Sequence, residues 1–442
     1  MLHRLTPMLH RLTKLLGIAT VAFVGGRHAY AQASPRLTLQ DARELALKNH
    51  PQIQAAQNEL GFANQQIVIN RAPYYPEVSG EITGSQGNNL SRIGAGDLSA
   101  SRLFDRFGQG VVIHQLVTDS GRTPNLVASA RFNAQATAHD LDATRYNVLL
   151  AVGRAYYDVL HAQAVVKVAE QTVAARQTLS DQVTELARNQ LKSQLDVSLV
   201  DVNVSEAKLL LIRAKEGVQQ ALAELGRALG SDQAANYQLV DEPLPPGPPD
   251  KPDDLVVQAE NNRPELASLR SSREGAYKFF EAEKDLNRPT VSVIAVGGGI
   301  PFINTPVNAP IPPEYEGVAA NVNIPVFNGH LFSARREAAH QRAMEADQRL
   351  RDQQERVARD VRVAWAGAIT AFQRIDVTAQ FLRQAALALD LAQGRYNLGL
   401  SSIVELTQSQ LNLTEAEIEN LSAKYDYQTQ NSVLQYTIGN LR

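Results

Sequence analysis

An internal repeat constrains the fold of this chain more than any other feature, because one architecture has to account for both copies. Asn49-His50-Pro51 recurs as Asn262-Arg263-Pro264, and at the same offset Pro76-Glu77-Val78 recurs as Pro289-Thr290-Val291. A second ungapped offset pairs residues 117–120 with 326–329, 155–156 with 364–365, 205–207 with 414–416, and 229–230 with 438–439. Each copy therefore reads as a helix, two strands, a long helix, a reversal and a second long helix.

The repeat divides the chain into four predicted segments, which are a signal peptide (1–31), a first repeat (32–240), a linker (241–253) and a second repeat (254–442). Proline lacks an N–H and favours extended backbone, so the proline-rich linker cannot continue a helix. Its prolines are Pro243, Pro245, Pro246, Pro248, Pro249 and Pro252. A ligand for a proline-recognising domain is the alternative, but the position between two copies favours a connector.

The first residues have the order of a secretory signal peptide. Arg4, Arg11 and Lys14 precede an apolar stretch at 15–26, and Ala29-Tyr30-Ala31 has the form of a cleavage site. The apolar stretch is shorter than the ~20 residues of a membrane-spanning helix, so we expect cleavage before Gln32. Residues 1–6 recur as 8–13, which leaves both Met1 and Met8 open as the translation start.

Heptad stripes of Val and Ala predict long antiparallel helical hairpins. A helix from Arg122 to Gln190 would be about 100 Å long at ~1.5 Å per residue, longer than a globular core requires. The first-copy stripe is Val148, Val152, Ala155, Val159, Ala162, Val166, Ala169 and Val173. Its second-copy counterpart is Val357, Val361, Ala364, Ala368, Ala371, Ile375, Thr378 and Leu382. The seams alone also fit a simple coiled-coil rod.

Four segments between the helices argue against a rod, because each is about as long as a membrane-spanning strand, ~9–11 residues. They are residues 76–85, 106–118, 289–298 and 317–327. The last alternates best, with Val318, Ala320, Val322, Ile324 and Val326 on one side. The glycine-rich stretches 84–96 and 297–313 then become connecting loops at the outer surface.

Four strands cannot close a barrel, and an open sheet edge in lipid leaves backbone groups unpaired. Three chains with four strands each would share twelve strands, inside the range of outer-membrane barrels. The predicted fold class is therefore mainly α with a membrane β-barrel. Each chain contributes two repeats of a long helical hairpin plus two strands, and a trimer builds a 12-stranded β-barrel above a 12-helix α-barrel.

Composition excludes several other functions. The net charge is −3, with 43 basic and 46 acidic residues, so no basic face for nucleic acid is expected. The chain has no cysteine, which excludes disulfides, thiolate metal sites and lipidation of an N-terminal cysteine. No zinc-protease, phosphate-loop or nucleophile-elbow motif occurs, so we predict no enzyme activity, no cofactor and no metal site.

These features together resemble the TolC-like outer membrane efflux protein family over essentially the whole mature chain. The resemblance rests on the two proline motifs, on residues 115–122 with their counterpart 324–329, and on the hairpin tip at 395–406. It implies a homotrimer in the lipid of the outer membrane that extends into the periplasm. It also implies two partners, a periplasmic adaptor (membrane fusion) protein and an inner-membrane transporter.

The resemblance assigns roles at the hairpin tips. Gly399, Leu400 and Ser401 match the turn that contacts the adaptor, whereas the first copy has Gln190 where the glycine is expected. The acidic ring that narrows the periplasmic entrance matches Glu405, its repeat counterpart Asp196, and Gln408, where an amide replaces the next acid. The alternative for both carboxylates is a favourable place at the positive end of a helix dipole.

Two functions from different classes follow. The first is a passive outer-membrane exit duct for efflux or secretion, driven by the inner-membrane partner. The second is a periplasmic coiled-coil scaffold or adhesin without a pore. The sequence leaves the substrate open among drugs, metals, other small molecules and polypeptides.

Overall fold

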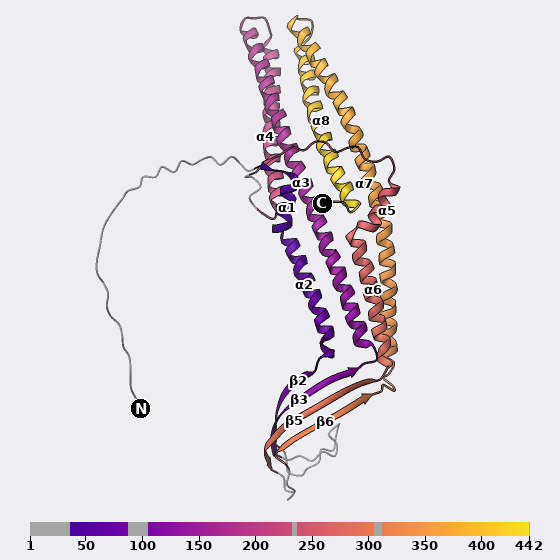
Figure 1. The fold of residues 1–442 in the computed structure, drawn as a ribbon. Coiled ribbons are helices and arrows are strands. Elements are labelled where there is room, and N and C mark those ends of the chain that lie inside the picture. Colours follow the sequence, from indigo (N-terminus) through magenta and orange to yellow (C-terminus); the bar gives the residue numbers. More distant parts are fainter. Residues whose placement is uncertain (1–35, 87–104, 232–236, 305–311, 442) are drawn as a thin grey trace, which may run out of the picture.

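The computed structural model describes residues 36–86, 105–231, 237–304 and 312–441, so the predicted signal peptide lies outside the described residues. The molecule is long and narrow, with a β-sheet at one end and two helical hairpin tips at the other (Figure 1). Both copies of the repeat contribute to each end, as the sequence predicts.

The two repeats share one order of elements, except that the short paired strands β1 and β4 occur only in the first repeat of the described chain. The first contains β1 (Arg36–Leu37), α1 (Leu39–Asn49), α2 (Pro51–Arg71), η1 (Ala72–Tyr74), β2 (Glu77–Ser85), β3 (Asp105–Thr118), α3 (Arg122–Arg188), α4 (Gln194–Leu229) and β4 (Gln238–Leu239). The second contains α5 (Asp253–Asn262), α6 (Pro264–Lys284), η4 (Asp285–Asn287), β5 (Thr290–Asn304), β6 (Glu314–Asn323), α7 (Leu331–Asn397) and α8 (Ile403–Thr437).

The repeated prolines mark a helix break. Pro51 and Pro264 are the first residues of α2 and α6, and the preceding His50 and Arg263 are extended. The first helical position tolerates proline because its N–H would lack a partner in any case. The residue before proline avoids the helical region, which separates α1 from α2 and α5 from α6.

The predicted long helices are confirmed, since α3 and α7 each contain 67 residues. Each pairs with a shorter returning helix, α4 or α8, and α3 also packs against α8. Most positions of the predicted stripes are buried, and the buried ones are Val148, Val152, Ala155, Val159, Ala169, Val357, Val361, Ala364, Ala368, Ala371 and Thr378. Small side chains at these positions let neighbouring helices lie close together. No described helix combines the length and hydropathy needed to cross a bilayer.

The four long strands form one antiparallel sheet in the order β2-β3-β5-β6. The inner strands come from different repeats, and β2 and β6 are the two edges (Figure 1). The predicted fourth strand, 317–327, was misplaced because β6 begins at Glu314 and ends at Asn323. Pro325 lacks the N–H that would continue the ladder, so residues 324–328 leave the sheet.

The predicted third strand, 289–298, was too short, because β5 continues to Asn304 and includes Gly297, Gly298 and Gly299. These glycines were assigned to a loop, yet they pair with β3 and β6. A Cβ on Gly298 would collide with the carbonyl oxygen of Gln109 and the hydroxyl of Tyr315. Gly298 therefore makes room for the side chain of Tyr315 on the neighbouring strand, which compensates for the missing side chain of the glycine.

Two aromatic residues at equivalent positions of the repeats hydrogen-bond the segment between the repeats to the long helices. Tyr156 on α3 donates a hydrogen bond to Val240 O at 2.6 Å, and Trp365 on α7 donates one to Pro249 O at 2.7 Å. The Tyr156 ring is fully buried, and burial raises the pKa of its hydroxyl to about 12. Both side chains thus contribute to packing, and each also donates a hydrogen bond to a carbonyl oxygen in or next to the linker between the repeats.

Candidate functional site at the hairpin tips

The two hairpin tips lie side by side at the end of the molecule away from the sheet (Figure 1). A shared apolar core joins them, so their turns are held in a fixed relation. Its buried members are Leu179, Val183, Val197 and Val200 of the first hairpin and Ala392, Tyr396, Ile403 and Leu406 of the second.

The second tip turns at Gly399, which has a φ of +73°. Gly399 N donates to Tyr396 O at 3.0 Å, and Leu400 N donates to Arg395 O at 2.8 Å. These are the two bonds of a Schellman C-cap, in which glycine adopts the left-handed conformation without steric cost. The turn therefore ends α7 in a defined geometry and directs the chain into α8.

The first tip keeps the same geometry without a glycine. Gln190 has a φ of +59°, and its N–H donates to Ala187 O at 2.9 Å. Leu191 N donates to Leu186 O at 2.9 Å, which completes the same pair of bonds. The missing glycine thus changes the side chain presented at this tip while the backbone turn stays alike.

Apolar side chains point into solvent at both tips. Leu191 in the first turn is 69% exposed, and Leu400 in the second is 67% exposed. Leu195, Leu398 and Val404 are also exposed. Of the three residues assigned to the adaptor contact, Gly399 and Leu400 are exposed, whereas Ser401 is half-buried. A cluster of exposed leucines in one small region is typical of a protein-binding surface.

Asp196 belongs to a capping box at the start of α4. Its Oδ2 accepts hydrogen bonds from the backbone N–H of Ser193 at 3.0 Å and from the Ser193 hydroxyl at 2.9 Å. The Ser193 Oγ in turn accepts from Asp196 N at 3.1 Å. This reciprocal pair satisfies N–H groups that the helix leaves free. The capping role of Asp196 is thus present, and it leaves the carboxylate half-exposed.

Glu405 is arranged differently at the start of α8. Ser402 Oγ caps the helix by accepting from Glu405 N at 3.3 Å, but the Glu405 carboxylate turns back to Arg395. Arg395 Nε lies 3.4 Å from Glu405 Oε1, and both side chains are exposed. Gln408, one turn further along, is exposed and donates to Asn412 Oδ1 at 2.9 Å. The negative charge at this position is therefore partly offset by a neighbouring cation.

The structure adds Lys192, which sequence reasoning gave no role. Its Nζ lies 4.3 Å from the centre of the Tyr396 ring, so a cation–π contact joins the first tip to the second. No ion pair or hydrogen bond joins Asp196 to Glu405 within the described part of one chain. Each predicted acid thus stays within its own hairpin, and Lys192 and Tyr396 make a contact between the hairpins at the tips.

In the described ranges, no group of three or more His, Asp or Glu side chains is arranged to hold a metal ion.

Comparison with known proteins gives a consistent result over nearly the whole chain. The sequence profile of the outer membrane efflux protein family matches residues 42–231 and 255–440, one match in each repeat. The outer membrane efflux protein BepC of Brucella suis is 22% identical over 418 residues, covering 92% of this chain and 87% of that protein. The alkaline protease secretion protein AprF of Pseudomonas aeruginosa is 26% identical over 433 residues, with coverage of 91% and 84%.

A solved membrane protein from Pseudomonas aeruginosa superimposes with a TM-score of 0.78 at 20% identity, covering 91% of this chain and 93% of that one. This likeness confirms the predicted fold class, mainly helical with a small set of long strands. The two profile matches cover most of the chain and show that it belongs to the outer membrane efflux protein family.

Proposed function

We propose that the chain forms the outer-membrane exit duct of a tripartite efflux or secretion system, passing substrates passively from the periplasm to the exterior. The observation that carries this proposal is the open four-stranded sheet. Its edges β2 and β6 have no partner strand in the described chain, and every residue of β6 is exposed. In lipid such edges must pair, and two further copies would close the sheet into a barrel of twelve strands.

The helical end supports the same assembly. The packing order is α4-α3-α8-α7, so α4 and α7 are the outer helices. Both expose apolar side chains at roughly heptad spacing on surfaces that no other part of the described chain covers. They are Leu195, Leu199, Val202, Leu209 and Ile212 on α4, and Val363, Val377, Leu387 and Leu391 on α7. Pairing α4 with α7 of the next copy would bury both stripes and close a barrel of twelve helices.

The exposed tip leucines support a periplasmic adaptor as the partner at the entrance. Leu400 and Leu191 lie in the two tip turns and would be costly to leave in water. An inner-membrane transporter then supplies the energy. The energy source, the adaptor and the pump all lie outside this chain.

The relatives do not decide the substrate class. One is named an alkaline protease secretion protein and another, CusC of Escherichia coli, a cation efflux system protein. Their identities to this chain are 26% and 21%, too close together to favour one class. Identification of the adaptor and pump that copurify with the chain is the measurement that separates polypeptide from small-molecule export.

The assembly and the pore are tested together by mass measurement in detergent and by conductance in planar bilayers. A trimer with discrete conductance steps supports the duct. The alternative, a periplasmic coiled-coil scaffold or adhesin without a pore, predicts a protein that fractionates with soluble periplasm and gives no conductance. A stable monomer in detergent would overturn the duct.

A further inference from the structure

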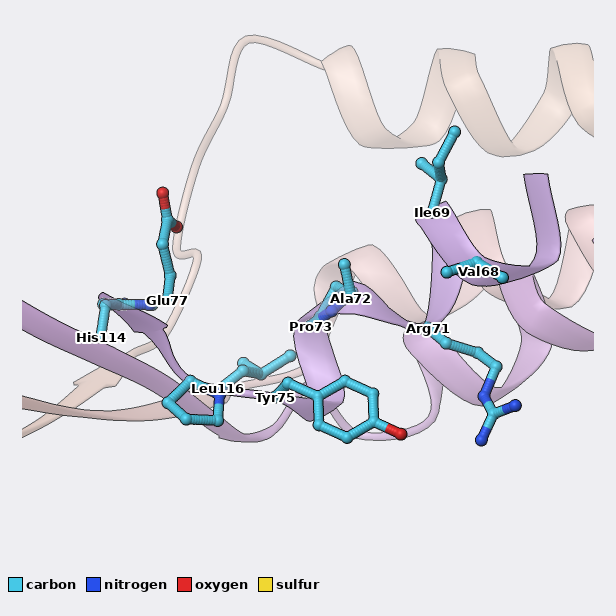
Figure 2. Close-up of a pocket in the computed structure, with 10 residues that line it drawn as sticks. Val68, Ile69, Arg71, Ala72, Pro73, Tyr75, Glu77, His114 and Leu116 are labelled. Carbon is cyan, nitrogen blue, oxygen red and sulfur yellow. The ribbon is translucent and has the colours of Figure 1, made fainter. Parts of the chain in front are cut away.

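An apolar hollow lies where the first repeat passes from helix to strand (Figure 2). Its volume is about 760 Å³, and Val68, Ile69, Pro73, Tyr75 and Leu116 line it with their apolar atoms. Figure 2 shows Val68 and Ile69 at the end of α2 on one side and Leu116 of β3 on the other, with Pro73 and Tyr75 between them. The hollow lies at the entry to β2, which is an edge strand of the sheet.

An exposed apolar segment lies at the corresponding junction on the opposite edge. It follows β6 and leads into α7. Val326 is 93% exposed and Phe327 is 81% exposed, and Leu331 at the start of α7 is exposed as well. Such large apolar side chains are rarely left fully in solvent without a partner.

The internal repeat shows how these two features are related. The β3–α3 junction and the β6–α7 junction have the same unusual backbone, with positive φ at Ser120 and Gly121 (59° and 112°) and at Gly329 and His330 (63° and 68°). Within the chain, the first of these junctions packs against the entry to β5. Ser120 Oγ donates to Pro289 O at 2.6 Å, and Arg288 Nη1 donates to Ser120 O at 3.0 Å.

If the repeat is followed, the β6–α7 junction should face the entry to β2 just as the β3–α3 junction faces the entry to β5. Only another copy of the chain can supply that entry to β2. The in-chain contact is polar, and Asp285 there accepts from Asn125 Nδ2 at 3.0 Å. The repeat counterparts are apolar on both sides. Tyr75 and Ala72 replace Arg288 and Asp285 on the receiving side, and Phe327 and Leu331 replace Thr118 and Arg122 on the inserting side.

We propose that Phe327 of one copy fills the hollow lined by Val68, Ile69, Pro73 and Tyr75 of the next copy, as the apolar counterpart of the Ser120–Arg288 contact. The proposal rests on the trimer of the proposed function and specifies where two copies join. This contact explains a difference between the two junctions. The β3–α3 junction finds its partner within one chain and is polar, whereas the β6–α7 junction finds its partner only in the assembly and is apolar.

The absence of cysteine from the chain permits a direct cross-linking test. Phe327→Cys and Tyr75→Cys are expressed in one cell as differently tagged chains, and the purified assembly is oxidised. We expect a disulfide between the two tags in most assemblies that contain both variants. Thr118→Cys, at the repeat position equivalent to Phe327, is the matched control and should give no cross-link to Tyr75→Cys.

A charge exchange tests the contact without a disulfide. Phe327→Asp and Tyr75→Lys should each lower the temperature at which detergent-solubilised trimers dissociate, and the double variant should recover most of the loss by pairing the new charges. Trimers that form normally but give no cross-link, together with equal losses that simply add in the double variant, would overturn this contact while leaving the duct intact. A stable monomer for the unaltered chain would overturn the duct itself.

Discussion

Gly230, which ends α4, packs directly against His50, the residue that separates α1 from α2. A Cβ on Gly230 would lie 3.0 Å from the Cα of His50, and Gly230 has a φ of +69°. The second repeat is crowded at the equivalent place: a Cβ on Gly439 would lie 3.0 Å from the carbonyl oxygen of Asn262, and a Cβ on Gly230 would lie 3.1 Å from that of its counterpart Asn49. The two most recognisable repeat motifs, the proline break and the terminal glycine, therefore contact each other in both copies.

We expect Gly439→Ala to destabilise the chain more than Gly399→Ala. Both glycines have positive φ, so alanine costs about 1 kcal/mol of conformational strain at each. Only Gly439 is also crowded by backbone, whereas the space around Gly399 is open. Urea unfolding followed by helical circular dichroism measures the difference. Equal unfolding midpoints for the two variants would show that the close contact at Gly439 is easily relieved.

The helix break should make the first repeat acid-sensitive. His50 Nδ1 accepts a hydrogen bond from Gln52 N at 3.3 Å and so caps α2. Burial lowers the pKa of His50 below its ordinary 6.5, and the nearby positive charge of Arg227 lowers that pKa further. The unfolded chain thus binds the proton more readily, so stability is lost as the pH falls below about 6.5.

The variant His50→Asn keeps an N-cap side chain and removes this titration. We expect it to lose less stability than the wild type between pH 7.5 and pH 5.5, because asparagine does not titrate in this range. His139→Asn, within α3, is the control for loss of a histidine that caps no helix. A pH dependence of unfolding that is unchanged in His50→Asn would contradict the assignment.

Much of the fold could be predicted because its signals are local and repeated. The heptad stripes predicted α3 and α7, whereas the single helix expected before each strand pair is divided in two at Pro51 and Pro264. The bounds of β5 and β6 could not be predicted in the same way, because they depend on distant partners. The sequence assigned Gly297 to Gly299 to a loop, whereas the strand register pairs Gly298 with Tyr315 of β6.

The same distinction between local signals and distant contacts applies to the residues at the hairpin tips. The capping role of Asp196 follows from Ser193 three residues earlier, which is a local pattern. The pairs Arg395–Glu405 and Lys192–Tyr396 depend on how a turn closes and on how two hairpins pack. Neither relation leaves a periodic signal in the sequence, so the electrostatic surroundings of the proposed entrance emerged only from the structure.

The contact between Lys192 and Tyr396 should hold the two hairpins together at the entrance. A cation–π contact at an exposed site is worth about 0.5–1 kcal/mol, so Lys192→Ala should raise the population of open tips by roughly 2- to 5-fold. Single-channel recording measures the open fraction. Lys192→Arg retains a cation over the ring and should behave as the wild type. Lys208→Ala, on α4 and away from the tip turn, is the control. If alanine and arginine at 192 gave the same open fraction, the contact would have no role in holding the tips.

The tip turn itself should discriminate between side chains at position 399. Valine is β-branched and strongly disfavours positive φ, whereas the first tip already accommodates Gln190 at +59°. We therefore expect Gly399→Val to weaken adaptor binding by about tenfold or more, since ~1–3 kcal/mol of strain acts on the turn. Gly399→Gln should bind nearly as the wild type does. Normal binding by the valine variant, measured by copurification or titration, would place the adaptor contact elsewhere.

The last prediction concerns ion selection at the entrance, where the proposed trimer brings three copies of Glu405 and three of Asp196 around one axis. Like charges held close should favour cations and bind divalent ions weakly. The Arg395 guanidinium, 3.4 Å from Glu405, opposes this effect, and Gln408 adds no charge. We therefore expect modest cation preference in the wild type, less in Glu405→Gln, and more in Arg395→Gln. Asp196→Asn should add to the loss, with a cost in helix stability because Asp196 also caps α4.

Glu415→Gln, on the same helix as Glu405 but about three turns from the tip, is the control. The measurement is the reversal potential and the block by divalent ions in planar bilayers under a salt gradient. Opposite shifts for Glu405→Gln and Arg395→Gln would identify the entrance charge, because a purely capping role gives no reason for the arginine variant to gain selectivity. Identical selectivity in all of these variants would show that the carboxylates only begin their helices and that the narrowest charged ring lies elsewhere.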